Sequence, residues 1–251
     1  MSGKKAKEKR RALRERPAIL VNAAFAKASA ERVLTADMSA VPATRATIFI
    51  VGWLRNIFEQ SRTIAVLAEA GLSHTAASNR RSFAETIVRL QWLHDMPKEE
   101  RVKAIDAMLD HEVELTKKAF DHIREMGYDS SVDLSEMDEM VTDAAQGEVK
   151  NQARQFLAAA KSTQGQSVGL FYAWREESQY SHASGALAAA YANPQHGRIG
   201  PAGQPPVADP DLEAHRLATF LAVFLVGRLL IEEGVADELA QAPANAFFNA
   251  Y

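Results

Sequence analysis

The sequence predicts an all-α protein, a bundle of about six to eight helices that follows a basic N-terminal arm. Strong helix formers, above all alanine, leucine, glutamate and arginine, dominate the middle of the chain. Apolar residues recur there at helical spacing, and few stretches alternate with the two-residue period of a half-buried strand. With 251 residues, of which 47% are hydrophobic, the chain is long enough to bury a sizeable core.

Proline and glycine delimit four helices in the first half of the chain. Proline suits the first turn of a helix but cannot continue one, and glycine is common just past the last turn. Within the third segment, Phe83, Ile87 and Leu90 recur at the spacing of one helical face. The four predicted helices span residues 17–36, 43–70, 79–95 and 98–126, and Pro17, Gly71, Pro97 and Gly127 mark their ends.

Four more helices are predicted in the second half. The first begins at Leu134–Ser135, with acidic residues in its first turn that favour the positive end of the helix dipole. The four span residues 134–161 with a kink at Gly147, 168–183, 186–192 and 211–233. We expect residues 17–234 to form a single domain.

Two segments of the chain lack a helical pattern. Residues 193–211 hold five of the nine prolines and no periodicity, which predicts an exposed loop. The tail, residues 235–251, is left without an assigned structure. Its aromatic residues Phe247, Phe248 and Tyr251 could dock on the body or on a partner.

Composition excludes several kinds of protein. The chain has no cysteine, so it can hold no disulfide, thiolate metal site or cysteine nucleophile. Its first residues are charged and lack the apolar stretch of a secretory signal. The longest apolar run, Leu217 to Gly227, is shorter than the roughly 20 residues that span a bilayer. We therefore expect a cytoplasmic protein with no membrane partner, in which this run is a buried core helix.

Charge is unevenly distributed along the chain. Residues 1–16 carry eight Lys or Arg residues and two Glu residues, a net charge of +6, so the remaining chain carries −9. A basic arm on an acidic body can bind nucleic acid, and the protein could be a binder that uses this arm. The alternative is that the arm is a solvated helical extension.

One segment, residues 171–184, is the candidate functional site. Arg175 and His182 are seven residues apart, nearly two helical turns, so both side chains are predicted to leave the same helix face. Ser178 lies between them on that face. Arginine binds phosphate oxygens with paired donors, and histidine transfers protons near neutral pH. Because RNA supplies its own 2′-hydroxyl nucleophile, this chemistry needs no metal and no cofactor.

The spacing of Arg175 and His182 resembles the signature of HEPN-type proteins, an arginine and a histidine separated by four to six residues late in a helical bundle. Many of these proteins are metal-independent endoribonucleases of toxin–antitoxin and phage-defence systems. The resemblance implies that Arg175 binds phosphate and that His182 acts as acid or base. It also implies a homodimer in which two histidines share one cleft, and a protein antitoxin or regulator as a further partner.

The chain also resembles, over residues 45–192, a bacterial helical family of unknown function. That family pairs an early Arg-x-x-x-Glu helix, here Arg81-Ser-Phe-Ala-Glu85, with a late aromatic, arginine, serine and histidine segment, here Trp174 to His182. The resemblance makes Glu85 a partner of the late segment. The predicted catalytic candidates are Arg175, His182, Ser178 and Glu85, and the predicted substrate-binding candidates are Arg81, Trp174 and Tyr180.

The same residues also fit a structural role. In this alternative the protein is a non-catalytic helical interaction or oligomerisation module. Glu85 would pair with Arg81, Arg89 or Arg175, and His182 would cap a helix end. A metal centre is not expected, because the Glu-x-x-His repeats of a di-iron bundle are absent. His111 and His122 are instead expected to be solvated on a charged helix.

Overall fold

The computed structural model describes residues 17–129, 133, 135, 139, 141–205 and 212–249, and it confirms the all-α prediction. Within these residues the chain forms eleven α-helices, one short 3₁₀ turn and no strand. The helix count therefore exceeds the predicted six to eight. The basic arm, Tyr251 and residues 206–211 of the predicted loop lie outside the described residues.

The first four helices end within two residues of their predicted limits. They are α2 (Ala18–Leu34), α3 (Arg45–Glu69), α4 (Ala77–Asp95) and α5 (Lys98–Glu125), with the 3₁₀ turn Ser73–Thr75 before α4. A capping box begins α3. The Thr44 hydroxyl accepts from the Thr47 amide at 3.2 Å, and the Thr47 hydroxyl accepts from the Thr44 amide at 2.9 Å.

The second half is more divided than predicted. Its helices are α7 (Gly147–Arg154), α8 (Phe156–Ser162), α9 (Val168–Ser181), α10 (Gly185–Ala192), α11 (Leu212–Glu232), α12 (Asp237–Ala240) and α13 (Ala242–Phe248). The predicted helix over 134–161 is wrong in its later part. Gly147, at φ 62°, begins α7 where a kink was expected, and extended backbone at Gln155 separates α7 from α8.

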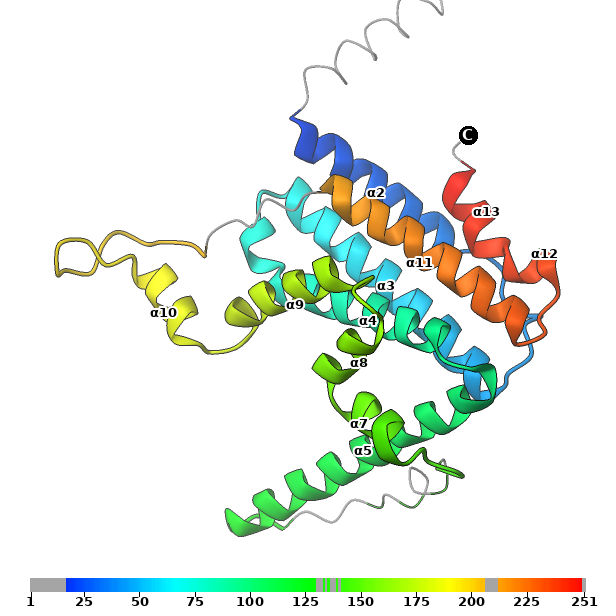
Figure 1. Ribbon diagram of the computed structural model, residues 1–251. Coiled ribbons are helices and arrows are strands. Elements are labelled where there is room, and N and C mark those ends of the chain that lie inside the picture. The colour runs from blue at the N-terminus through cyan, green and yellow to red at the C-terminus, as the bar shows by residue number, and fades with distance from the viewer. Residues whose placement is uncertain are drawn as a thin grey trace, which may run out of the picture.

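Helix α3 lies at the centre of the bundle and packs against α2, α4 and α11 (Figure 1). The core between these helices includes the fully buried side chains of Phe58, Trp92 and Leu229. By length and composition alone α11 could cross a membrane, but half of its apolar window is buried against the other helices. One face of α11 therefore belongs to the core, as predicted for the apolar run, whereas Leu217, Phe220 and Phe224 of the same run are exposed.

The described part of the C-terminal tail is folded onto the bundle. The Arg32 guanidinium donates from Nε to the Ala246 carbonyl and from Nη2 to the Phe247 carbonyl, both at 2.8 Å. The Phe247 ring lies 6.1 Å from the ring of Phe58 in the core. Phe248 is exposed and contacts Phe220 of α11 at 5.6 Å. The described tail thus packs against α2 and α11.

Candidate functional site

A buried ion pair fixes α9 on α4. The Arg80 guanidinium donates to both carboxylate oxygens of Glu177, at 2.5 and 2.9 Å, and to the Ser73 carbonyl at 2.7 Å. Glu177 is only 6% exposed. Neither residue was predicted. A signal was present, because Arg80 precedes Phe83 and Ile87 by three and seven residues and so shares the apolar face of α4.

The predicted early and late segments meet beside this ion pair. The Trp174 indole N–H donates to Glu85 Oε2 at 2.9 Å. The Arg81 guanidinium lies over the Trp174 ring, 5.4 Å from its centroid, and its Nη1 lies 2.7 Å from His182 Nε2. Four of the seven predicted site residues therefore form one connected cluster between α4 and the end of α9.

The contact between Arg81 and His182 defines the histidine tautomer. A guanidinium has donors only, so His182 Nε2 must accept the hydrogen bond. The imidazole in this arrangement is consequently neutral and carries its proton on Nδ1. The His182 side chain is exposed to solvent.

The other three predicted site residues lie outside this cluster. Arg175 is exposed, and no hydrogen bond or ion pair joins it to another residue of the described chain. The Ser178 hydroxyl donates to the Trp174 carbonyl of its own helix at 2.7 Å, and Tyr180 is half-buried. The predicted continuous face ends early, because α9 stops at Ser181 and His182 adopts extended backbone, φ −123° and ψ 164°.

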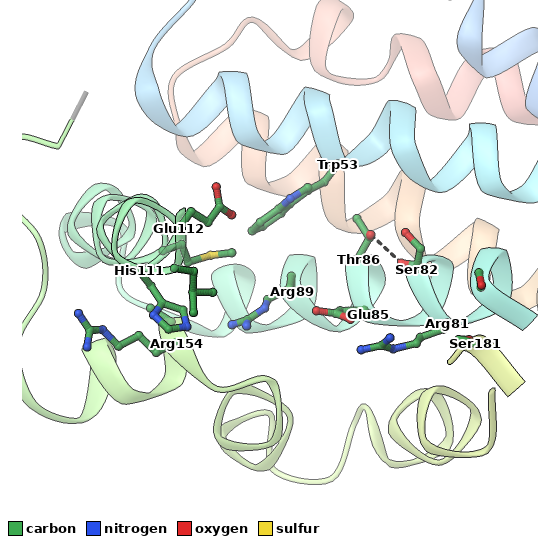
Figure 2. A pocket seen from close by; sticks show the side chains of 14 residues that line it. Trp53, Arg81, Ser82, Glu85, Thr86, Arg89, His111, Glu112, Arg154 and Ser181 are labelled. Atoms are coloured by element: carbon green, nitrogen blue, oxygen red, sulfur yellow. Dashed lines mark hydrogen bonds between the residues drawn. The ribbon is translucent and has the colours of Figure 1, made fainter. Parts of the chain in front are cut away.

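A polar pocket of about 600 Å³ extends from this cluster along α4 (Figure 2). Arg81, Glu85 and Arg89 follow one another at four-residue intervals on the pocket face of α4. Residues of α3, α5, α7 and α9 complete the walls: Trp53, Met108, His111, Glu112, Leu115, Ala153, Arg154 and Ser181. Such a volume is in the usual range for small-ligand sites.

Burial perturbs two ionisable groups of the pocket. Arg89 is 7% exposed and donates to the Gln152 carbonyl at 2.7 Å. Desolvation lowers the pKa of Arg89, while the charges of Glu85 and Glu112 oppose that shift. Desolvation also raises the pKa of Glu112, against the opposing charges of His111 and Arg89. Both shifts favour the neutral form, but only Arg89 is buried, because Glu112 lies at the exposed rim of the pocket.

Three buried nitrogen atoms of pocket residues have no hydrogen-bond partner: Arg81 Nε, His111 Nδ1 and Arg154 Nε. Buried polar atoms without partners are uncommon, and a bound ligand or water often explains them. Of the two histidines expected to be solvated, His122 is exposed, whereas His111 is half-buried and lines the pocket. Across the residues that the structure describes, no three His, Asp or Glu side chains gather as metal ligands would.

Fold and site together define an all-α protein with an Arg–His pair beside a polar pocket that the arginine, Arg81, lines. Residues 47–193, more than half of the chain, match the model of a family of unknown function (DUF5677), and the chain belongs to that family. The matched region contains every residue of the cluster and the pocket. It coincides closely with the 45–192 range expected from the resemblance. No curated protein and no solved structure is significantly similar to the chain.

Proposed function

We propose that this protein is a metal-independent endoribonuclease that acts on cytoplasmic RNA as a toxin or in phage defence. The observation that carries the proposal is the 2.7 Å contact between His182 Nε2 and Nη1 of Arg81, a residue that lines the pocket. The HEPN resemblance supports the type of activity. In this proposal Arg81, predicted among the substrate-binding residues, takes the phosphate-binding role that the resemblance implied for Arg175.

Each residue of the pair has a defined task in this reaction. Arg81 moves from His182 to the scissile phosphate and stabilises its developing charge with paired donors. The freed Nε2 of His182 accepts the proton of the RNA 2′-hydroxyl, whose oxygen attacks phosphorus. The bond to the 5′-oxygen breaks, and this oxygen takes a proton from water or from a second acid, which leaves a cyclic 2′,3′-phosphate and a 5′-hydroxyl. Glu85 positions Trp174, on which Arg81 rests.

Metal-free RNA cleavage tests the proposal. Purified protein, incubated with a mixed-sequence RNA and a chelator, is expected to produce fragments that end in cyclic phosphate. The His182→Ala variant, with an unchanged circular dichroism spectrum, is expected to lose at least 100-fold in rate, the usual contribution of a proton-transfer group. Wild-type protein that leaves varied RNAs intact would contradict the proposal.

We also propose a homodimer, with a protein antitoxin or regulator as a further partner. The support is α10, which directly follows His182 and consists of glycine and apolar residues, none of them buried. An eight-residue helix is marginal by itself in water and normally depends on packing. If α10 packs on a second copy, the two copies of His182 lie near each other, and the second could protonate the leaving 5′-oxygen.

A non-catalytic interaction module is the second candidate. The buried Arg80–Glu177 pair favours it, because that pair and the Trp174–Glu85 bond join α4 to α9 in the manner of a structural network. This candidate predicts that Arg81→Ala lowers stability while neither the wild type nor the variant acts on RNA. The cleavage assay above therefore separates the two candidates.

A further inference from the structure

The far end of the pocket differs in chemistry from the end that holds Arg81 and His182. Arg89 is eight residues beyond Arg81 on α4, about 12 Å along the helix axis. There the walls are the half-buried indole of Trp53 from α3 and the side chains of His111 and Glu112 from α5 (Figure 2). An aromatic surface, a carboxyl group and a buried guanidinium thus meet in one compartment.

We propose that this compartment is a base-binding subsite for a nucleotide, in which Trp53 stacks on an unpaired base and Glu112 and His111 hydrogen-bond to its edge. The inference rests on the proposed function and extends it to the selection of RNA. Arg89 would bind the phosphate of the same nucleotide, and the bond to be cut would lie toward Arg81. The protein would therefore cleave at a preferred base.

The groups present match what an unpaired base requires. Proteins read single-stranded RNA by stacking bases on aromatic side chains and hydrogen-bonding to their edges. A carboxylate accepts from exocyclic amino groups, so Glu112 favours a base that carries one. His111 Nδ1 is buried without a partner and can bond to a base edge.

Arg89 is suited to a phosphate. Within the described residues it makes no ion pair with a carboxylate and donates to the Gln152 carbonyl. Its guanidinium also lies over the rings of Trp92 and Phe156, 5.4 and 5.8 Å from their centroids. Desolvation lowers the pKa of Arg89 and the charges of Glu85 and Glu112 oppose that shift, so an incoming phosphate would supply the direct counter-charge that the described residues do not.

Binding to uncleaved ligands tests the subsite. In a His182→Ala background, titration calorimetry would measure the affinity for each of the four nucleoside monophosphates. Fluorescence anisotropy would measure the affinity for short homopolymeric RNAs. These two arms distinguish a free nucleotide from a nucleotide unit of RNA. We expect adenine, cytosine and guanine, which carry an exocyclic amino group, to bind more tightly than uracil, which carries none. Trp53→Ala is expected to weaken binding about tenfold or more, the scale of one lost stacking contact.

Two further variants and one control variant complete the test of the subsite. Trp53→Phe retains an aromatic face, so its affinity is expected to stay within a few-fold of that of the parent. This variant tests the stacking contact even if Trp53→Ala unfolds. Glu112→Gln is expected to change the base preference, whereas Glu125→Gln, on the exposed end of the same helix, is expected to change nothing. Equal affinities for all bases would overturn the subsite. A Trp53→Phe variant that binds as weakly as Trp53→Ala, together with a Glu112→Gln variant that keeps the base preference of the parent, would also overturn it.

Failure of the subsite is distinguishable from failure of the proposed function. If the wild-type protein cleaves RNA with no base preference, and the Trp53→Ala variant gives the same cleavage pattern, the subsite alone is overturned. Protein that binds monophosphates through Trp53 and Glu112 but cleaves no RNA would support the subsite and overturn the ribonuclease.

Discussion

His215 on α11 is a histidine whose charge state is decided by burial. Its Nε2 lies 2.8 Å from the Ser61 hydroxyl, and its ring stacks on Phe83 at 4.2 Å. Burial lowers its pKa from 6.5 to about 4, and the nearby charge of Arg80 adds to that shift. The folded protein therefore holds the imidazole neutral at pH values at which the unfolded chain protonates it.

This shift predicts a loss of stability in mild acid. Above pH 6.5 neither state binds the proton, and the stabilisation is fully present. As the pH falls from about 6.5 to 4, only the unfolded state binds it, and about 3 kcal/mol of unfolding free energy is lost. Urea denaturation at pH 7 and pH 4.5 checks this. His215→Gln is expected to be less pH-sensitive than the wild type, and equal sensitivity would contradict the prediction.

Several of the residue-level predictions required contacts that a sequence does not contain. The spacing of Arg175 and His182 indicated a pair, but the partner of His182 is Arg81, about a hundred residues earlier. The pairing depends on where α9 ends and how it lies on α4. The early Arg-x-x-x-Glu motif does lie against the late segment, because Arg81 and Glu85 share the α4 face that meets Trp174 and His182.

At the scale of elements, α9 depends on its ion pair with α4. Substituting Glu177 by Gln removes the charge that compensates buried Arg80, and breaking a buried pair in this way costs about 3–5 kcal/mol. Chemical denaturation would measure the loss. Glu176→Gln, the matched change at the exposed neighbouring position, is expected to stay within about 0.5 kcal/mol of the wild type. Similar values for the two variants would show that the buried pair does not hold α9.

Helix boundaries were predictable where the chain has strong stop signals and unpredictable elsewhere. Pro97 and Gly127 flank α5 as expected. Between α7 and α8 the break falls at Gln155, a residue with no such signal, and the contacts of Arg89 with Gln152 and Phe156 on either side of it accompany the break. Tertiary contacts, which the local sequence does not encode, fix that boundary.

For the whole molecule, the exposed apolar helix α10 predicts self-association. Ala189→Glu places a charge on an exposed position of α10 without lowering its helix propensity much, so it is expected to convert a dimer to a monomer. Size-exclusion chromatography with light scattering checks this, and Ala119→Glu on the exposed face of α5 is the control. A wild-type protein that remains monomeric at high concentration would rule out the homodimer.

Arg81 lines the pocket and contacts His182 beside it, whereas Arg175 does not line the pocket. The most direct measurement compares the metal-free RNA cleavage rates of Arg81→Ala and Arg175→Ala, each verified as folded by its thermal melt. A phosphate-binding Arg81 predicts a rate at least 100-fold below the wild type for Arg81→Ala and a rate near the wild type for Arg175→Ala. The reverse order would contradict the assignment of the site to Arg81.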